Sequence, residues 1–423
     1  MRQISFNLLA GRMARCFTVL FAAQLCAPAA AGDPVANERA EARAEESIVP
    51  EAHAAWVYDV TNRPGEPRRY DPGYFATGLN NYNRNAKGGH KIRLIYTYAG
   101  SLEMYCPDRD ATQCRLEDLI AIYPLNADKR LHGADGEATV RAYASKIEAS
   151  LAGGPVMVVP VIDGAITGEY EGSMKGFNEL PRELARAFAD KVSRKVCADP
   201  NVAGVQFDIE PFNVSQKNGQ FYFYQRIAEN FAGTVPATLR EGAVNCKTDQ
   251  FPRGRFFSVF ASSNQLNPEG PAARNIREIL TQFNNGYFIA PLYDLGSGPP
   301  GHALSVTEYQ KRAERHAKQM AKWSAKSNVM FQLGVPASAT VHEHAYCRGG
   351  ACSRAPGGAS DVPTQDAYLR AALDAIDKSG ARQSPYFRGV SVWGWTRGVA
   401  VHGLEFEPQV PPWNALSLLG ERL

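Results

Sequence analysis

Two acidic side chains, Asp208 and Glu210, stand two residues apart in the otherwise apolar stretch NVAGVQFDIEPFN, residues 201–213. Side chains alternate between the two faces of a β-strand, so a strand here would direct Gln206, Asp208 and Glu210 to one face and the apolar residues between them to the other. Two neighbouring carboxylates repel each other when both are ionised, so one of them is expected to hold a proton near neutral pH. A protonated carboxylic acid can act as a general acid. The alternative is that both acids only form ion pairs with Arg or Lys, although carboxylates in apolar surroundings are costly without a function.

The acidic stretch is one of eight strand-like segments that alternate with helical ones. These segments are AAWVYDV (54–60), KIRLIYTYA (91–99), PVMVVPVID (155–163), VAGVQFDIE (202–210), RFFSVFASS (255–263), YFIAPLYDL (287–295), NVMFQLGVP (328–336) and FRGVSVWGW (387–395). Eight is the number of parallel strands that closes a barrel. An open doubly wound sheet is the competing fold, but the sequence lacks the Gly-rich phosphate turn that usually follows its first strand.

Helical spacing with start and stop signals appears between these segments. Pro181 suits the first helical position of PRELARAFADKV, and Ser305 and Glu308 have capping-box spacing ahead of an apolar stripe. Gly380 supplies a stop after DAYLRAALDAIDKS. We therefore predict an α/β fold, a (β/α)8 TIM barrel over residues 54–423, with the acids at the C-terminal mouth where barrel enzymes place their chemistry.

The N-terminus has the layout of a secretory signal peptide. Residues 1–31 carry three Arg and no acid, followed by a short apolar run that ends in small residues. A transmembrane anchor fits less well because the run is short and contains Gln24 and Pro28. Residues 32–53 are rich in Ala and Glu and are expected to form a tether. We predict a secreted or periplasmic protein that has no membrane attachment after signal removal and is a monomer.

Charge and cysteine content exclude several classes of partner. Removing three Arg with the signal leaves 43 basic against 43 acidic side chains, so neither nucleic acid nor an anionic membrane is expected as a partner. Six cysteines remain, an even number that favours disulfides in an exported chain, with a connectivity that spacing alone leaves open. No CxxC pair is present, and His342 and His344 form an isolated HxH, so no metal and no other cofactor is predicted.

Four stretches resemble, in order, the motifs of glycoside hydrolase family 18, the chitinase-like barrels. VAGVQFDIEPF resembles the fourth-strand signature DGxDxDxE, and APLYDL resembles the sixth-strand M-x-Y-D with Tyr293 and Asp294. QLGVPAS resembles the seventh-strand GxP segment, and GVSVWGW resembles the eighth strand that ends in a Trp, here Trp393. The resemblance implies a β-linked, N-acetylglucosamine-containing polysaccharide or oligosaccharide as substrate.

The resemblance also implies a retaining, substrate-assisted mechanism, one of the exceptions to the two-carboxylate scheme. Glu210 would protonate the glycosidic oxygen, and Asp208 would hold the acetamido N–H and stabilise the developing positive charge. The Tyr293 hydroxyl would bond the acetamido oxygen, and Trp393 would lie under the sugar. The further candidate substrate contacts are Gln206, Asp294, Asp163 and, on the second and eighth predicted strands, Tyr98 and Trp395.

The sequence departs from the family pattern at several positions. Ala203 and Gln206 stand where the signature has Asp, and the third strand ends in Asp163 and Gly164 in place of a Gly-rich motif. Gln206 can donate a hydrogen bond to Asp208 but cannot share a proton, so slower or pH-shifted catalysis is expected. These departures favour a catalytically silent glycan-binding protein as the first alternative. A barrel glycosidase for a sugar without an acetamido group, with Asp208 as nucleophile, is the second.

Overall fold

The computed structural model describes ten stretches of the chain: 47–57, 72–123, 156–233, 244–293, 295, 304–336, 345–348, 351–354, 365–393 and 413–423. Several positions within these stretches are described by their backbone alone, among them Tyr98 and the segments 345–348 and 351–354. No helix in the described part is long and apolar enough to cross a bilayer.

Eight parallel strands form a closed ring. β1 pairs with β2 on one side and with β11 on the other, and between them the ring runs through β4, β5, β6, β7 and β8. The strands are β1 His53–Val57, β2 Ile92–Met104, β4 Met157–Ala165, β5 Gly204–Glu210, β6 Phe256–Phe260, β7 Gly286–Pro291, β8 Met330–Pro336 and β11 Phe387–Trp393. Each falls on one of the eight predicted segments. The predicted (β/α)8 TIM barrel is therefore confirmed.

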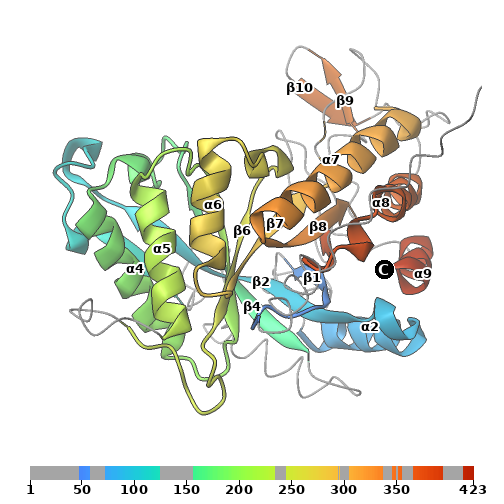
Figure 1. Ribbon diagram of the computed structural model, residues 1–423, viewed down its shortest axis with the longest axis horizontal. Helices are drawn as coiled ribbons and strands as arrows, with labels where there is room; N and C mark the ends of the chain where they lie inside the picture. Colours follow the sequence, from blue (N-terminus) through green and yellow to red (C-terminus); the bar gives the residue numbers. More distant parts are fainter. Residues whose placement is uncertain are drawn as a thin grey trace, which may run out of the picture. The chain divides into compact units, whose positions relative to one another are not determined.

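Helices lie on the outside of the strands (Figure 1). They are α2 Pro72–Asn85, α4 Arg182–Cys197, α5 Gly219–Ala232, α6 Pro271–Thr281, α7 Val306–Ser327, α8 Gln365–Ser379 and α9 Trp413–Arg422. The Ser305 hydroxyl accepts a hydrogen bond from the backbone N–H of Glu308 at 3.2 Å, so the predicted cap of α7 is confirmed. Gly380 follows α8 with φ of +76°, a conformation that favours glycine. Pro181 is the N-cap of α4, one residue before the position predicted for it.

One further strand, β3, extends the barrel sheet at β2, and two more strands form a separate hairpin. β2 continues beyond the ring and pairs antiparallel with β3, Leu119–Ile122. The disulfide between Cys106 and Cys114 closes the loop that joins these two strands. β9, Ala345–Arg348, and β10, Ala351–Arg354, form the hairpin, in which the backbone register sets Cys347 opposite Cys352.

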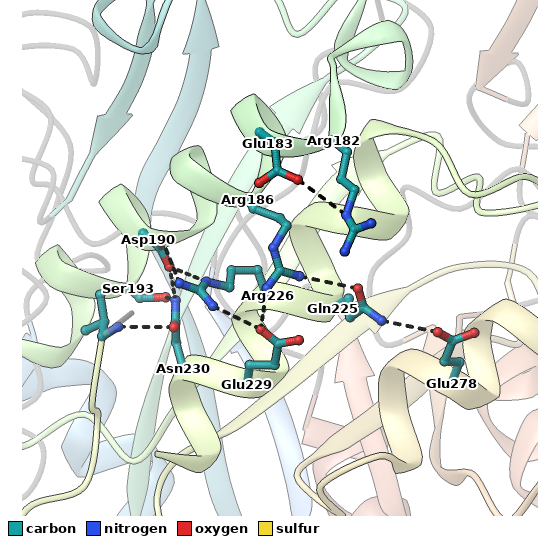
Figure 2. A network of polar contacts seen from close by, with 11 residues as sticks. Arg182, Glu183, Arg186, Asp190, Ser193, Gln225, Arg226, Glu229, Asn230 and Glu278 are labelled. Atoms are coloured by element: carbon teal, nitrogen blue, oxygen red, sulfur yellow. Dashed lines mark hydrogen bonds and ion pairs between the residues drawn. The ribbon is translucent and has the colours of Figure 1, made fainter. Parts of the chain in front are cut away.

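A buried polar network joins α4 to α5, the two helices that precede and follow β5 (Figure 2). Arg226 of α5 donates two hydrogen bonds to the carboxylate of Asp190 on α4, at 2.7 and 3.1 Å, and a third to Glu229 at 3.1 Å. Arg186 also donates to Glu229, at 2.8 Å. A disulfide from Cys197, the last residue of α4, to Cys246 adds a covalent link beside this network. The frame around β5 is therefore held by both ion pairs and a cross-link.

The described end of the predicted tether contacts the barrel. Val49 is 5% exposed, and the Ser47 hydroxyl donates to the backbone oxygen of Asn284 at 2.9 Å. The backbone N–H of Ala52 donates to the backbone oxygen of Arg388 at 2.8 Å, and β1 begins at the next residue. Residues 47–53 thus lead directly into the first barrel strand.

Candidate active site

β5 carries the two candidate acids to the mouth of the barrel. Phe207 faces outward, where its ring lies 5.7 Å from the rings of Phe223 and Tyr224 on α5. Its neighbours in sequence face inward, and Asp208 is partly buried while Glu210, the last residue of the strand, is exposed. The predicted alternation of β5 is confirmed. It places both carboxylates at the C-terminal end of the ring, where Glu210 contacts solvent.

A third carboxylate lies beside this pair on the neighbouring strand. The parallel register of β4 and β5 sets Asp163 opposite Asp208 and Ala165 opposite Glu210. Paired residues of adjacent strands point to the same face and their backbones lie about 4.8 Å apart. Asp163, Asp208 and Glu210 therefore form a cluster of like charge, which we call the mouth carboxylates.

Ionisation of all three mouth carboxylates together is disfavoured by their proximity. Burial first, and then the negative charges of Glu210 and Asp163, raise the pKa of Asp208 well above its ordinary value. Of the two acids of β5, Asp208 is therefore the one whose protonated form is favoured. Burial, and then the charge of Asp208, also raise the pKa of Tyr224, whose ring lies behind β5.

Aromatic rings from several strand ends line the same mouth. Tyr293, two residues after β7, stacks on Trp393, the last residue of β11, with ring centres 5.0 Å apart and planes 26° apart. Phe260, the last residue of β6, stacks on Tyr293 with centres 6.3 Å apart. Tyr293 covers one face of the Trp393 indole, and the two residues are only 5% and 9% exposed. Sequence reasoning missed Phe260, although it ends its strand as Trp393 does.

Gln206 belongs to a layer of neutral polar groups beneath the acids. Its amide N–H donates to the backbone oxygen of Phe207 at 2.8 Å, and its amide oxygen accepts from the hydroxyl of Ser258 on β6. In the same layer the Tyr96 hydroxyl lies 2.6 Å from that of Tyr287 and donates to Gln332 at 2.7 Å. The hydrogen bonds that the structure gives Gln206 are to Ser258 and to the backbone oxygen of Phe207, and a bond to Asp208 is not among them.

An exposed tyrosine stands at the rim beside Asp163. Tyr170, in the loop after β4, is 61% exposed, and its pKa is raised by partial burial and then by the charges of Asp163 and Glu103. It borders a pocket of about 190 Å³ whose wall is built from the ends of β2 and of this loop, including Tyr105, Arg109 and Lys175. Sequence reasoning did not identify this residue.

The remaining predicted site residues are not brought into this cluster by the described structure. Tyr98 lies on β2, with only its backbone described, and Asp294 and Trp395 lie outside the described residues, as do His342 and His344. Among the residues whose positions are described, no group of three His, Cys, Asp or Glu is arranged to hold a metal ion.

A scan of the sequence against protein-family models finds no match, and a search of the curated proteins finds none either. Among solved structures, a glycoside hydrolase family 18 chitinase from Pseudoalteromonas aurantia is 11% identical, with 86% of this chain and 98% of that chain covered and a TM-score of 0.45. A Bacillus megaterium spore cortex-lytic enzyme is 13% identical, with 88% and 74% covered and a TM-score of 0.42. A variant of the Xanthomonas axonopodis pv. citri endo-β-1,4-glucanase is 13% identical, with 88% and 98% covered and a TM-score of 0.45. These scores are low, and the barrel assignment rests on the strand pairing itself.

Proposed function

We propose that the protein is an exported glycoside hydrolase that cleaves β-linked glycans containing N-acetylglucosamine. The observation that carries this proposal is the pairing of an exposed acid, Glu210, with a partly buried acid, Asp208, whose pKa is raised. One group can reach a bound substrate, and the other can hold a proton at neutral pH. Trp393, which stacks on Tyr293 and is 9% exposed, is the proposed aromatic contact for the sugar.

The proposed reaction uses one proton that the two acids of β5 share. In the free enzyme Asp208 holds this proton, and substrate binding transfers it to Glu210. Glu210 then protonates the glycosidic oxygen as the bond to the anomeric carbon breaks, and the acetamido oxygen of the sugar closes onto that carbon as an oxazolinium ion. Asp208, now anionic, stabilises the positive charge. Water then attacks the anomeric carbon and gives its proton to Glu210.

Gln206 makes a proton relay below Asp208 impossible, because its amide is held in a neutral layer by Ser258. Asp163, which lies opposite Asp208 in the strand register, is the acid of β4 that faces it. We assign Asp163 the role of keeping Asp208 protonated in the resting state through its negative charge. Tyr170 at the rim offers a second aromatic contact for a longer glycan.

The test is a digest of N-acetylglucosamine oligomers and of peptidoglycan by the mature protein, with products identified by mass spectrometry. Glu210→Gln keeps the size of the side chain and removes the acid, so the rate is expected to fall by about 10²- to 10⁴-fold. Glu421→Gln on α9, an exposed position far from β5 in sequence, is the matched control and should cleave at the wild-type rate. Full activity in Glu210→Gln would contradict the proposal.

A silent glycan-binding protein is the second candidate, and the engagement of Gln206 by Ser258 favours it. It predicts that wild type and Glu210→Gln bind the oligomers equally well and that neither cleaves them. Isothermal titration with the same oligomers separates the two candidates, because binding without any cleavage by wild type supports only the second.

A further inference from the structure

A large pocket lies at the end of the barrel opposite the mouth carboxylates. It has a volume of about 680 Å³, within the range of small-molecule sites. Its walls come from the first residues of β1, the turn before β2 and the first residues of β11, which are the N-terminal ends of parallel strands. Asp208 and Glu210 lie at the C-terminal end of β5, so this basal pocket is a separate place on the barrel.

The basal pocket is rich in cationic side chains. Its described lining contains Lys91, Arg93, Arg382 and Arg388, with Glu51 as the carboxylate side chain among them. Arg388 is 3% exposed, and its guanidinium donates to the backbone oxygens of Pro385 at 2.9 Å and Phe387 at 3.2 Å. Burial lowers the pKa of this Arg, and the charge of Glu51 opposes that effect.

The pKa of the His53 imidazole is lowered by its burial and by the positive charges around it. Burial, and then the charges of Arg382 and His90, lower the pKa of His53 to about 4. Its Nδ1 accepts a hydrogen bond from the backbone N–H of Val390 at 3.0 Å. The charged groups around it come from three elements: Arg382 after α8, His90 before β2, and Arg388 on β11, with Glu51 just ahead of β1.

The walls of the basal pocket are held in place by bonds among the residues that line or border it. Arg382 forms an ion pair with Asp377 at 2.7 Å and donates to the backbone oxygens of Arg422, at 2.8 Å, and of Leu423. Nδ1 of His90 lies 3.2 Å from the backbone oxygen of Gly420. Gly389 has φ of +129°, and a Cβ there would meet the backbone oxygen of Ala52 at 2.4 Å. A fixed frame reduces the ordering cost of binding a ligand.

We propose that the basal pocket is a binding site for the phosphate group of a small ligand. Guanidinium and ammonium groups that line one cavity recognise phosphate through charge-assisted hydrogen bonds and charge attraction, and Lys91 and Arg93 supply such groups here. This site is independent of the proposed hydrolase activity. Whether the natural ligand is free phosphate, a diphosphate or a phosphorylated sugar is decided by the comparison of probes below.

The experiment is isothermal titration of the full chain with inorganic phosphate, pyrophosphate and glucose 6-phosphate at constant ionic strength. Lys91→Gln removes a partly exposed cation of the lining, and Lys326→Gln, an exposed lysine at the end of α7, is the matched control. We expect at least one probe to bind at millimolar concentration or below. Its affinity should fall about tenfold in Lys91→Gln and remain unchanged in Lys326→Gln.

A second readout is the pKa of His53, followed by NMR of histidine-labelled protein. An anion bound in the basal pocket favours the charged imidazolium, so saturating ligand should raise this pKa from about 4 toward its ordinary value. The proposal is overturned if no probe binds, if both lysine variants lose affinity equally, or if the pKa of His53 does not move. Each of these outcomes is independent of whether the mouth carboxylates cleave a glycan.

Discussion

The buried network between α4 and α5 yields a stability prediction whose size can be worked out from its geometry. Arg226 is 3% exposed in its side chain, and its partners Asp190 and Glu229 are 9% and 7% exposed. Arg226→Met removes the guanidinium and leaves two carboxylates buried. Glu229 keeps its ion pair with Arg186 at 2.8 Å, and Asp190 keeps a hydrogen bond from Asn230 at 2.7 Å.

Breaking one side of a buried ion pair costs about 3–5 kcal/mol. Because both carboxylates retain one partner, we expect a loss near the lower end, about 3 kcal/mol of unfolding free energy. The matched control is Arg115→Met. Arg115 pairs with Glu117 at 3.7 Å with side chains 76% and 68% exposed, so its loss should cost less than about 1 kcal/mol.

The assay is equilibrium urea unfolding of wild type and both variants, followed by circular dichroism. The double variant Asp190→Asn with Arg226→Met should lose less than the sum of the two single changes, because the first change removes the charge that the second leaves without its cation. A loss in Arg226→Met no greater than that in Arg115→Met would refute the reasoning and would mean that the network is compensated by water or by movement of α5.

Three further predictions concern pH and the cross-links. Asp208 has a raised pKa in the folded state, so its contribution to stability is fully present below the pKa of about 3.9 in the unfolded chain and is lost as pH rises. Asp208→Asn should therefore be more stable than wild type at pH 7 but not at pH 3. Equal stability of the two proteins at pH 7 would contradict this prediction. The pKa of His53 in the folded state is lowered to about 4, so stability should fall as pH drops from about 6.5 through 4. In His53→Asn the urea unfolding midpoint should therefore depend less on pH across that range. The same pH dependence in variant and wild type would count against a buried neutral imidazole. Replacing Cys197 and Cys246 by Ser should lower the free energy of unfolding by about 4 kcal/mol, because the disulfide closes a loop over a separation of 49 residues. Reduced wild type is the comparison. A loss below about 1 kcal/mol would show that the helix frame does not depend on this disulfide.

Much of the barrel was predictable because its strands are buried on both faces. β5, β8 and β11 read as nearly continuous apolar runs, and all eight predicted segments contain a barrel strand. Local capping chemistry was equally readable, as the side chain of Ser305 at the start of α7 shows. Boundaries were less accurate: β7 ends at Pro291, so Tyr293 lies beyond the strand that was predicted to carry it.

The composition of the site was only partly predictable. Asp208 and Glu210 stand out because two acids interrupt an apolar run. Phe260 and Tyr170 gave no such signal, since a strand-end phenylalanine and a loop tyrosine are common in any sequence. The hydrogen bond between Gln206 and Ser258 was not predicted, because the position of Ser258 on the next strand cannot be read from the spacing of residues on β5.

The sequence by itself determined the alternation of strands and helices, the inward direction of the acids on β5 and the caps that begin and end the helices. These features depend on contacts between residues close together in the chain, which periodicity reveals. Tertiary structure decided everything that depends on register between strands: the placing of Asp163 opposite Asp208, and with it part of the rise in the pKa of Asp208. It also decided the basal pocket, whose lining joins His53, Lys91 and Arg388 from opposite ends of the chain. The physical reason is that closing the barrel brings β11 beside β1, a contact that no local pattern encodes.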